Sequence, residues 1–227
     1  MAQLSDLETL SFNDNFLSGT LPKSILALPN LRMASFAIDR LYGTLPSELS
    51  KATKLEVLEL NSNQMDGTIV TELGMATNLK ELNLAQNTFE GSVPVEFSSL
   101  TNLVHLDLES NMGITGRIPS DFALFTDLRY LSISSTNIRA RIASEYRSLT
   151  KLEDLRIANT QVGGNIPLTL GELTRLTHLD LSGSKFRQEL PDVIGDLWNL
   201  RKCSELQRKN VLLGKLTSVL LLKSQNI

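Results

Sequence analysis

Five side chains suited to proton transfer or to ligand binding recur at nearly constant spacing along the sequence. They are Glu81, His105, Tyr130, Asp154 and His178, separated by 24, 25, 24 and 24 positions. An aspartate beside a histidine is the minimal pair for acid–base catalysis or for metal binding. What this row can do therefore depends on the elements that carry it.

The row belongs to a repeat that runs along nearly the whole chain. The residue that follows a glycine-centred turn marks the phase of each unit, at Leu21, Leu45, Ile69, Val93, Ile118, Ile142, Ile166 and Leu190. The single interval of 25 comes from one extra residue in the NMGIT segment, residues 111–115. A unit of this size cannot close a core alone, so the eight units are expected to stack on one another.

Two hydrophobic periods alternate inside each unit. The pattern LxxLxLxxN at residues 7–15, 55–63, 79–87 and 103–111 has a period of two in its LxL core, which is typical of a half-buried strand. The second half of each unit spaces its apolar residues by three and four, which predicts short helical turns. Stacked units should form one parallel sheet with buried leucines at 58, 60, 82, 84, 106 and 108 and with Glu59, Asn83 and Asp107 facing outward.

The residue that ends the strand motif changes type along the chain. This column reads Asn15, Asp39, Asn63, Asn87, Asn111, Thr136, Thr160 and Ser184. Asparagine can donate to and accept from the backbone of the turn, whereas a hydroxyl does part of this with a shorter reach. The last three turns are therefore expected to differ somewhat in shape while remaining stacked.

These motifs resemble the plant-type class of leucine-rich repeat proteins, whose unit reads LxxLxLxxNxLxGxIPxxLxxLxxL. Residues 103–128, LVHLDLESNMGITGRIPSDFALFTDL, match that unit with one insertion, and the resemblance covers roughly residues 4–200. It implies an α/β fold, a right-handed solenoid with a concave parallel β-sheet and short helical or 3₁₀ turns on the convex side. Members include receptor-like kinase and receptor-like protein ectodomains and inhibitors of pectin-degrading enzymes, which all act by binding.

The C-terminal 27 residues depart from the repeat. They hold six Lys or Arg residues against one acid, and the motif breaks at Cys203, Glu205 and Arg208. We therefore assign residues 1–200 to a solenoid of about eight 24-residue repeats and residues 201–227 to an atypical tail, either a cap or non-native sequence. The apolar segment at 210–223 is too short for a membrane span of about 20 residues, so no span is expected in this chain.

Marks of secretion are absent from the sequence. The chain enters the first repeat within seven residues without a signal peptide, Cys203 is the only cysteine, and there is no Asn-x-Ser/Thr glycosylation acceptor. The resemblance implies a parent that is extracellular or associated with the plasma membrane. These features together predict a fragment, or a truncated gene model, of a longer protein, and they leave its localisation open.

The outward columns of the predicted sheet carry the candidate ligand-binding residues. On the concave face these are Glu59, Glu81, Asn83, His105, Asp107, Glu109, Tyr130, Asp154, Arg156, His178 and Asp180. Six acids against one arginine favour a basic or hydrogen-bonding partner, with Tyr130 as aromatic anchor. A face that is merely solvated would explain the same residues, since strand formation does not require their identities.

We predict a binding module rather than an enzyme. An open concave sheet does not exclude water, and the sequence places no nucleophile or third metal ligand near Asp154 and His178, so neither a cofactor nor a metal is expected. The net charge of −3 argues against nucleic acid. The expected partner is a protein or peptide ligand, or a glycan, bound by part of a receptor-like protein. The alternative is an intracellular or structural scaffold without a receptor role.

Overall fold

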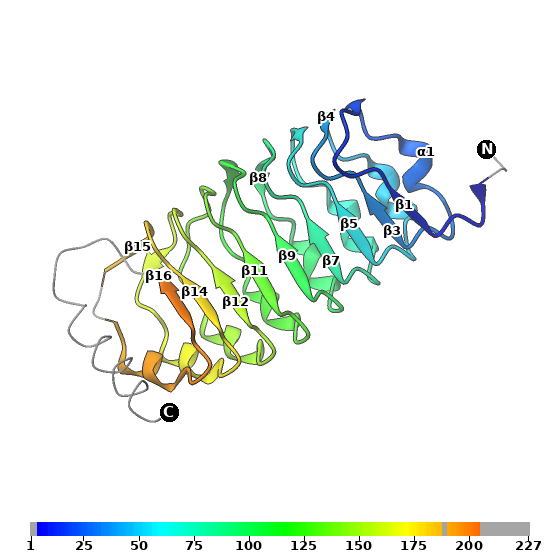
Figure 1. Cartoon of the computed structure of the whole chain (residues 1–227). Coiled ribbons are helices and arrows are strands. Elements are labelled where there is room, and N and C mark those ends of the chain that lie inside the picture. The colour runs from blue at the N-terminus through cyan, green and yellow to red at the C-terminus, as the bar shows by residue number, and fades with distance from the viewer. Residues whose placement is uncertain (1–3, 188–189, 205–227) are drawn as a thin grey trace.

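The computed structural model describes residues 4–187 and 190–204, and its largest element is a nine-stranded parallel sheet (Figure 1). Each strand is three residues long. In spatial order the strands are β1 (Thr9–Ser11), β3 (Met33–Ser35), β5 (Val57–Glu59), β7 (Glu81–Asn83), β9 (His105–Asp107), β11 (Tyr130–Ser132), β12 (Asp154–Arg156), β14 (His178–Asp180) and β16 (Lys202–Ser204).

Short helical turns follow the strands, on the opposite side of the repeats from the sheet's outer face (Figure 1). They are α1 (Lys23–Leu26) and the 3₁₀ turns η2 (Ser47–Lys51), η3 (Thr71–Met75), η4 (Val95–Ser99), η5 (Ser120–Leu124), η6 (Ser144–Ser148), η7 (Leu168–Glu172) and η8 (Asp192–Asp196). The residue before each turn has extended backbone angles and is usually proline, as at Pro46 and Pro94. Proline fixes φ at this position, and because proline has no backbone N–H group, no hydrogen-bond donor is left unpaired there.

Smaller parallel sheets run along one edge of the solenoid. One contains β2 (Ser18–Gly19), β4 (Arg40–Gly43) and β6 (Gln64–Met65), a second contains β8 (Glu90–Ser92) and β10 (Gly113–Thr115), and a third contains β13 (Gly163–Gly164) and β15 (Lys185–Phe186). The glycines two residues before the phase marks have positive φ, for example 69° at Gly67 before Ile69, a backbone conformation that residues with side chains rarely adopt. The extra residue of the fifth unit lies in this edge region and leaves the main sheet in register.

The leucine ladder forms the core. Leu58, Leu82 and Leu106 are paired in parallel register and fully buried, as are Leu60, Leu84 and Leu108. The predicted α/β solenoid with one parallel sheet and short helical turns is therefore confirmed. Glu59 and Asn83 face outward and are partly exposed, whereas Asp107 faces outward but is only 9% exposed, because neighbouring side chains on the same face cover it.

The turns after the strands share one backbone conformation along the chain. The residue before each Asp, Asn or Thr of the column that ends the strand motif has a positive φ, between 53° and 63° at the six positions from Ile38 to Asn159. Examples are 58° at Ser110, before Asn111, and 54° at Ser135, before Thr136. The expectation that the last three turns would differ in shape is therefore wrong for the backbone of the Thr136 and Thr160 turns. What differs is the hydrogen bonding of the side chain.

The main sheet extends one strand beyond the eight predicted units. Strand β16 pairs with β14 in the same register as every earlier pair, with Cys203 opposite Leu179 and Lys202 opposite His178. The assignment of residues 201–227 as a separate tail stays a prediction beyond this strand, because residues 205–227, including the apolar segment 210–223, lie outside the described residues. Within the described part of the chain, no helix is long and apolar enough to cross a membrane.

Candidate ligand-binding face

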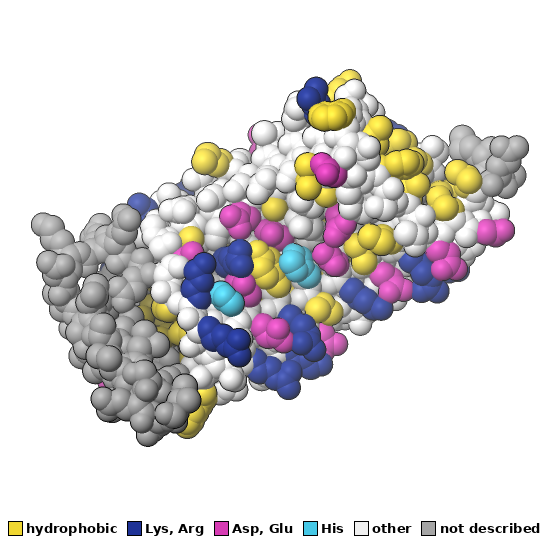
Figure 2. All heavy atoms as spheres, viewed as in Figure 1, with side chains coloured by type: hydrophobic (Ala, Val, Ile, Leu, Met, Phe, Trp, Pro, Cys, Tyr) yellow, Lys and Arg dark blue, Asp and Glu magenta, His cyan; other side chains and the backbone are white. Residues whose placement is uncertain are grey.

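The outer face of the nine-stranded sheet, called here the concave face, brings all the predicted site residues together. The parallel register places His105 beside Tyr130, Tyr130 beside Asp154, and Asp154 beside His178. Of the eleven candidates, ten are half-buried and Asp107 is buried. In Figure 2 acidic and basic side chains surround the two histidines on this face. The constant repeat spacing therefore predicted the row correctly.

A stack of planar groups crosses the middle of the concave face. The His105 and Tyr130 rings are parallel, with centroids 4.2 Å apart and planes inclined by 3°. The Arg156 guanidinium covers the Tyr130 ring, with Cζ 5.1 Å from the ring centroid. His105 and Arg156 thus already contact the Tyr130 ring, which remains partly exposed, and its role as an aromatic anchor stays a prediction.

Carboxylates hold this stack in place. Arg156 donates to both oxygens of Asp154, from Nε at 3.0 Å and from Nη2 at 2.8 Å, and this bond raises the pKa of the guanidinium further. The Tyr130 hydroxyl donates to Asp107 Oδ2 at 3.3 Å, while the Glu109 backbone N–H donates to Asp107 Oδ1 at 2.9 Å. The stack is thus prepositioned by side chains of the sheet itself, which lowers the ordering cost of binding.

Burial shifts the titration of the groups at the centre of this face. It raises the pKa of Asp107 to about 6, an effect that the Glu109 N–H bond only partly offsets. Burial also lowers the pKa of His105, whose Nε2 is buried and has no hydrogen-bond partner among the described residues. The pKa of Glu81 is raised, mainly by burial and secondly by Glu59. The centre of the face is therefore a poorly hydrated surface.

The acids on the concave face near the start of the sheet differ in ion pairing from the acid Glu56 at its rim. At the rim, Glu56 pairs with Arg32 and Lys80 at 2.6 Å each, and these cations lower its pKa. Glu59 and Glu81 have no ion-pair partner among the residues that the structure describes. Glu59 accepts a hydrogen bond from the Ser35 hydroxyl, and no described cation neutralises either charge.

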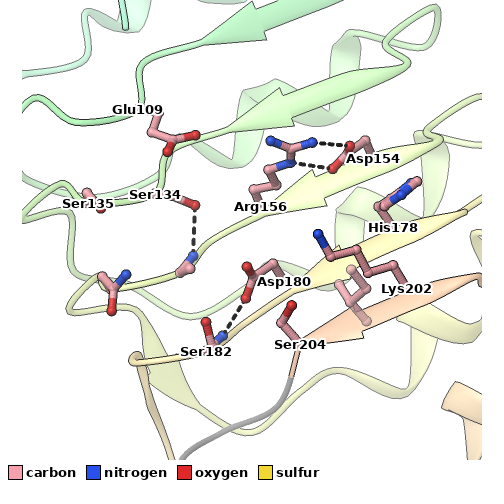
Figure 3. Close-up of a pocket in the computed structure, with 13 residues that line it drawn as sticks. Glu109, Ser134, Ser135, Asp154, Arg156, His178, Asp180, Ser182, Lys202 and Ser204 are labelled. Atoms are coloured by element: carbon pink, nitrogen blue, oxygen red, sulfur yellow. Dashed lines mark hydrogen bonds and ion pairs between the residues drawn. The ribbon is translucent and has the colours of Figure 1, made fainter. Parts of the chain in front are cut away.

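A pocket of about 220 Å³ lies at the C-terminal end of the concave face (Figure 3). It is lined by Glu109, Ser134, Ser135, Asp154, Arg156, Ala158, Asn159, His178, Leu179, Asp180, Ser182, Lys202 and Ser204. Sequence reasoning missed Lys202 and Ser204 because the motif appeared to end before them. The signal was present, since position 202 follows His178 by the regular 24 residues.

Within residues 4–187 and 190–204, no third metal ligand joins Asp154 and His178. Asp154 is engaged by Arg156, and His178 Nδ1 lies 2.9 Å from the Thr177 hydroxyl. Among the described residues no group of three or more His, Cys, Asp or Glu side chains is arranged to hold a metal ion. The arrangement offers hydrogen bonds and charges to a ligand.

The family comparison agrees with this repeat architecture. The family model described as Leucine Rich Repeat matches residues 6–28, 78–100 and 175–197, which fall in three of the stacked units. The chain is a leucine-rich repeat protein. Its repeats are of the plant type, as the solved structures with this fold also indicate. No curated protein matches the chain significantly.

Similar solved structures include receptor ectodomains. The plant peptide hormone receptor RGFR1 in complex with RGF2 has a TM-score of 0.86 at 27% identity, over 89% of this chain and 32% of that one. The Arabidopsis receptor kinase HAESA ectodomain, in complex with an extended IDA peptide hormone, has a TM-score of 0.78 at 33% identity, over 85% and 33%.

The fold also occurs outside plants. The leucine-rich repeat protein LIC12759 of Leptospira interrogans has a TM-score of 0.76 at 30% identity, over 90% of this chain and 51% of that one. The leucine-rich repeat chain thus spans about a third of the two plant ectodomains and about half of the bacterial protein. These likenesses support a repeat module that binds ligands or proteins.

Proposed function

We propose that this leucine-rich repeat module binds a protein or peptide partner on its concave face, without catalysis, as part of an extracellular receptor-like protein. The observation that carries the proposal is the prepositioned stack of His105, Tyr130 and Arg156, held by Asp107 and Asp154. The parallel sheet needs none of these side chains for its own pairing. The solved receptors in complex with peptide hormones support the class of partner.

The charge of the face favours a partner with basic residues. Glu59, Glu81 and Glu109 make no ion pair within the described part of the chain, and Glu81 is partly desolvated already. A basic side chain placed over them would compensate charge at a surface that has lost part of its water, where the interaction is stronger than in bulk solvent. Binding should weaken and slow as salt screens these acids.

Selection of peptides from a displayed random library on the immobilised full chain tests this function. Three changes on the face, Glu59→Gln, Glu81→Gln and Glu109→Gln, remove charge while preserving side-chain shape. We expect the selected peptides to be enriched in Lys and Arg and to bind this triple variant at least about tenfold more weakly.

The matched control carries the same charge change on the convex turns: Glu96→Gln, Asp121→Asn and Glu145→Gln, at exposed positions. It should bind the selected peptides as the unaltered chain does. Equal binding by both triple variants, or loss confined to the convex one, would remove the concave face as the binding surface. Enrichment of no peptide family would favour the scaffold alternative.

A further inference from the structure

The pocket at the C-terminal end of the concave face is lined by cationic and anionic side chains, some of which form no ion pair among the described residues. Asp154 and Arg156 neutralise each other through their bidentate contact. Of the other charged groups lining the pocket, Glu109, Asp180 and Lys202 form no ion pair among the described residues. In Figure 3 the Lys202 side chain extends from β16 across the pocket toward β14 and β12. The pocket therefore offers cationic and anionic groups side by side.

The remaining lining adds hydroxyl groups and fixed orientation. The pocket lining includes three serines, Ser134, Ser182 and Ser204, beside residues of β14 and β16. One oxygen of Asp180 accepts the Ser182 backbone N–H at 2.9 Å, which orients the carboxylate and leaves its second oxygen available. The Ser134 hydroxyl accepts the Ala158 N–H at 3.0 Å and retains its own hydrogen to donate. The cavity wall thus supplies both hydrogen-bond donors and acceptors.

This lining disfavours a simple ion. An anion drawn to Lys202 would lie near Asp180 and Glu109, and a cation drawn to Asp180 would lie near Lys202 and Arg156, so each would be repelled by part of the wall. A neutral ligand whose neighbouring atoms both donate and accept hydrogen bonds could bond to the cationic and the anionic groups of the wall without being repelled by either. Hydroxyl groups on adjacent carbons have this property, since each is a donor and an acceptor.

We propose that this pocket binds one sugar residue, with one ring hydroxyl donating to Asp180 and an adjacent one accepting from Lys202. Its volume of about 220 Å³ lies below the range of about 300–1,000 Å³ for drug-sized ligands, so it fits a single small ring. Ser134, Ser182 and Ser204 complete the ring of hydrogen bonds. The pocket adjoins the central stack and shares Asp154 and Arg156 with it, so the sugar would occupy a second position on the same face.

The test is an NMR titration of the isotopically labelled full chain with methyl glycosides of glucose, galactose, mannose and xylose. We expect at least one glycoside to give saturable shifts of backbone amides in β12, β14 and β16. Asp180→Asn and Lys202→Met should each weaken that binding by about tenfold or more, because each removes a hydrogen bond to a charged group. Lys51→Met, on the convex turn η2, should leave it unchanged.

Three results would overturn the sugar site. The first is the absence of saturable shifts with any of the four glycosides. The second is unchanged affinity in both pocket variants, whose folding is checked by their circular dichroism and thermal midpoints. The third is tighter binding of N-acetylasparagine amide, acetate or guanidinium than of every glycoside, which would assign the pocket to a peptide side chain or an ion. Peptide selection on a variant with only Glu59→Gln and Glu81→Gln, which lie outside the pocket lining, reports on the proposed function separately.

Discussion

The asparagine turns in the middle of the solenoid and the hydroxyl turns after them hold the same backbone in different ways. Asn111 is fully buried and donates to Leu84 O at 2.9 Å and Leu108 O at 3.1 Å, while its Oδ1 accepts the Phe89 N–H at 3.1 Å. It therefore joins two repeats. Thr136 donates at 2.7 Å to Ile133 O in its own repeat.

The backbone of the hydroxyl region compensates locally. The Ile114 N–H, which a longer side chain at position 136 could reach, already donates to Asn111 O at 3.0 Å, and the Val162 N–H donates to the Thr160 hydroxyl at 3.2 Å. At Thr136 the bond between repeats is thus replaced by a bond within a repeat, whereas Ser184 still joins two repeats, since it donates to Ile157 O and accepts the Thr160 N–H at 3.2 Å. The polar pocket lies mainly on the hydroxyl region, where hydroxyl groups rather than amides supply the side-chain bonds between units.

The largest expected effect comes from the core, where the two regions should not differ. Leu84→Ala in the asparagine region and Ile157→Ala in the hydroxyl region each remove a fully buried side chain, so each should lower the free energy of unfolding by about 2–5 kcal/mol. Urea denaturation followed by circular dichroism measures both. A much smaller loss for Ile157→Ala would mean that the hydroxyl region is also loosely packed, and the contrast would no longer concern turns alone.

The turn residues themselves should separate the regions. Asn111→Ala strands buried carbonyl and N–H groups from two repeats and should cost about 2–4 kcal/mol, whereas Thr136→Ala removes one bond within a repeat and should cost about 1 kcal/mol. The same denaturation experiment compares them. Equal costs would contradict the idea that asparagine supplies the links between units.

Asp107 lies on the concave face where the asparagine region meets the hydroxyl region, and its contribution to the free energy of unfolding should depend on pH. The pKa of Asp107 is raised to about 6, so the folded protein holds this proton more tightly than the unfolded chain, whose aspartates titrate near 3.9. Stability from this group is therefore present below about pH 4 and is lost as pH rises through about 6.

Asp107→Asn should remove this dependence. The variant should be more stable than the unaltered chain by about 1–3 kcal/mol at pH 7.5, and the difference should vanish near pH 4. Thermal unfolding across that range measures it. A difference that stays constant with pH would show that Asp107 remains ionised in the folded protein throughout.

The smallest expected effect concerns the one acid in the turn column. Asp39 accepts the Leu17 N–H at 3.1 Å, but its other oxygen is buried without a partner among the described residues. Position 39 is equivalent to position 63 in the next repeat, where the Asn63 amide donates to Phe36 O and Leu60 O. Asp39→Asn supplies the same kind of amide donor one repeat earlier, so it should stabilise the fold by about 1 kcal/mol. Destabilisation instead would indicate that the Asp39 turn is built differently from the central asparagine turns.

The sequence by itself determined the repeat, the parallel sheet and the identity of its outward columns. A side chain at a given phase must lie beside its counterparts 24 residues away, because each unit packs on a copy of itself. This is why Tyr130, Asp154 and His178 could be placed in one row, and why Leu58, Leu82 and Leu106 could be assigned to the core.

Only the tertiary structure decided how the side chains within those columns pair. Spacing gives the neighbours of Tyr130 but not its rotamer, so His105 stacking, the Arg156 contact and the resulting burial of Asp107 could not be read from the repeat. The ninth strand was likewise visible only in the tertiary structure. The pairing of Cys203 with Leu179 continues the ladder although the motif around it has lost its leucines, because backbone hydrogen bonds and register extend a parallel sheet with little demand on residue type.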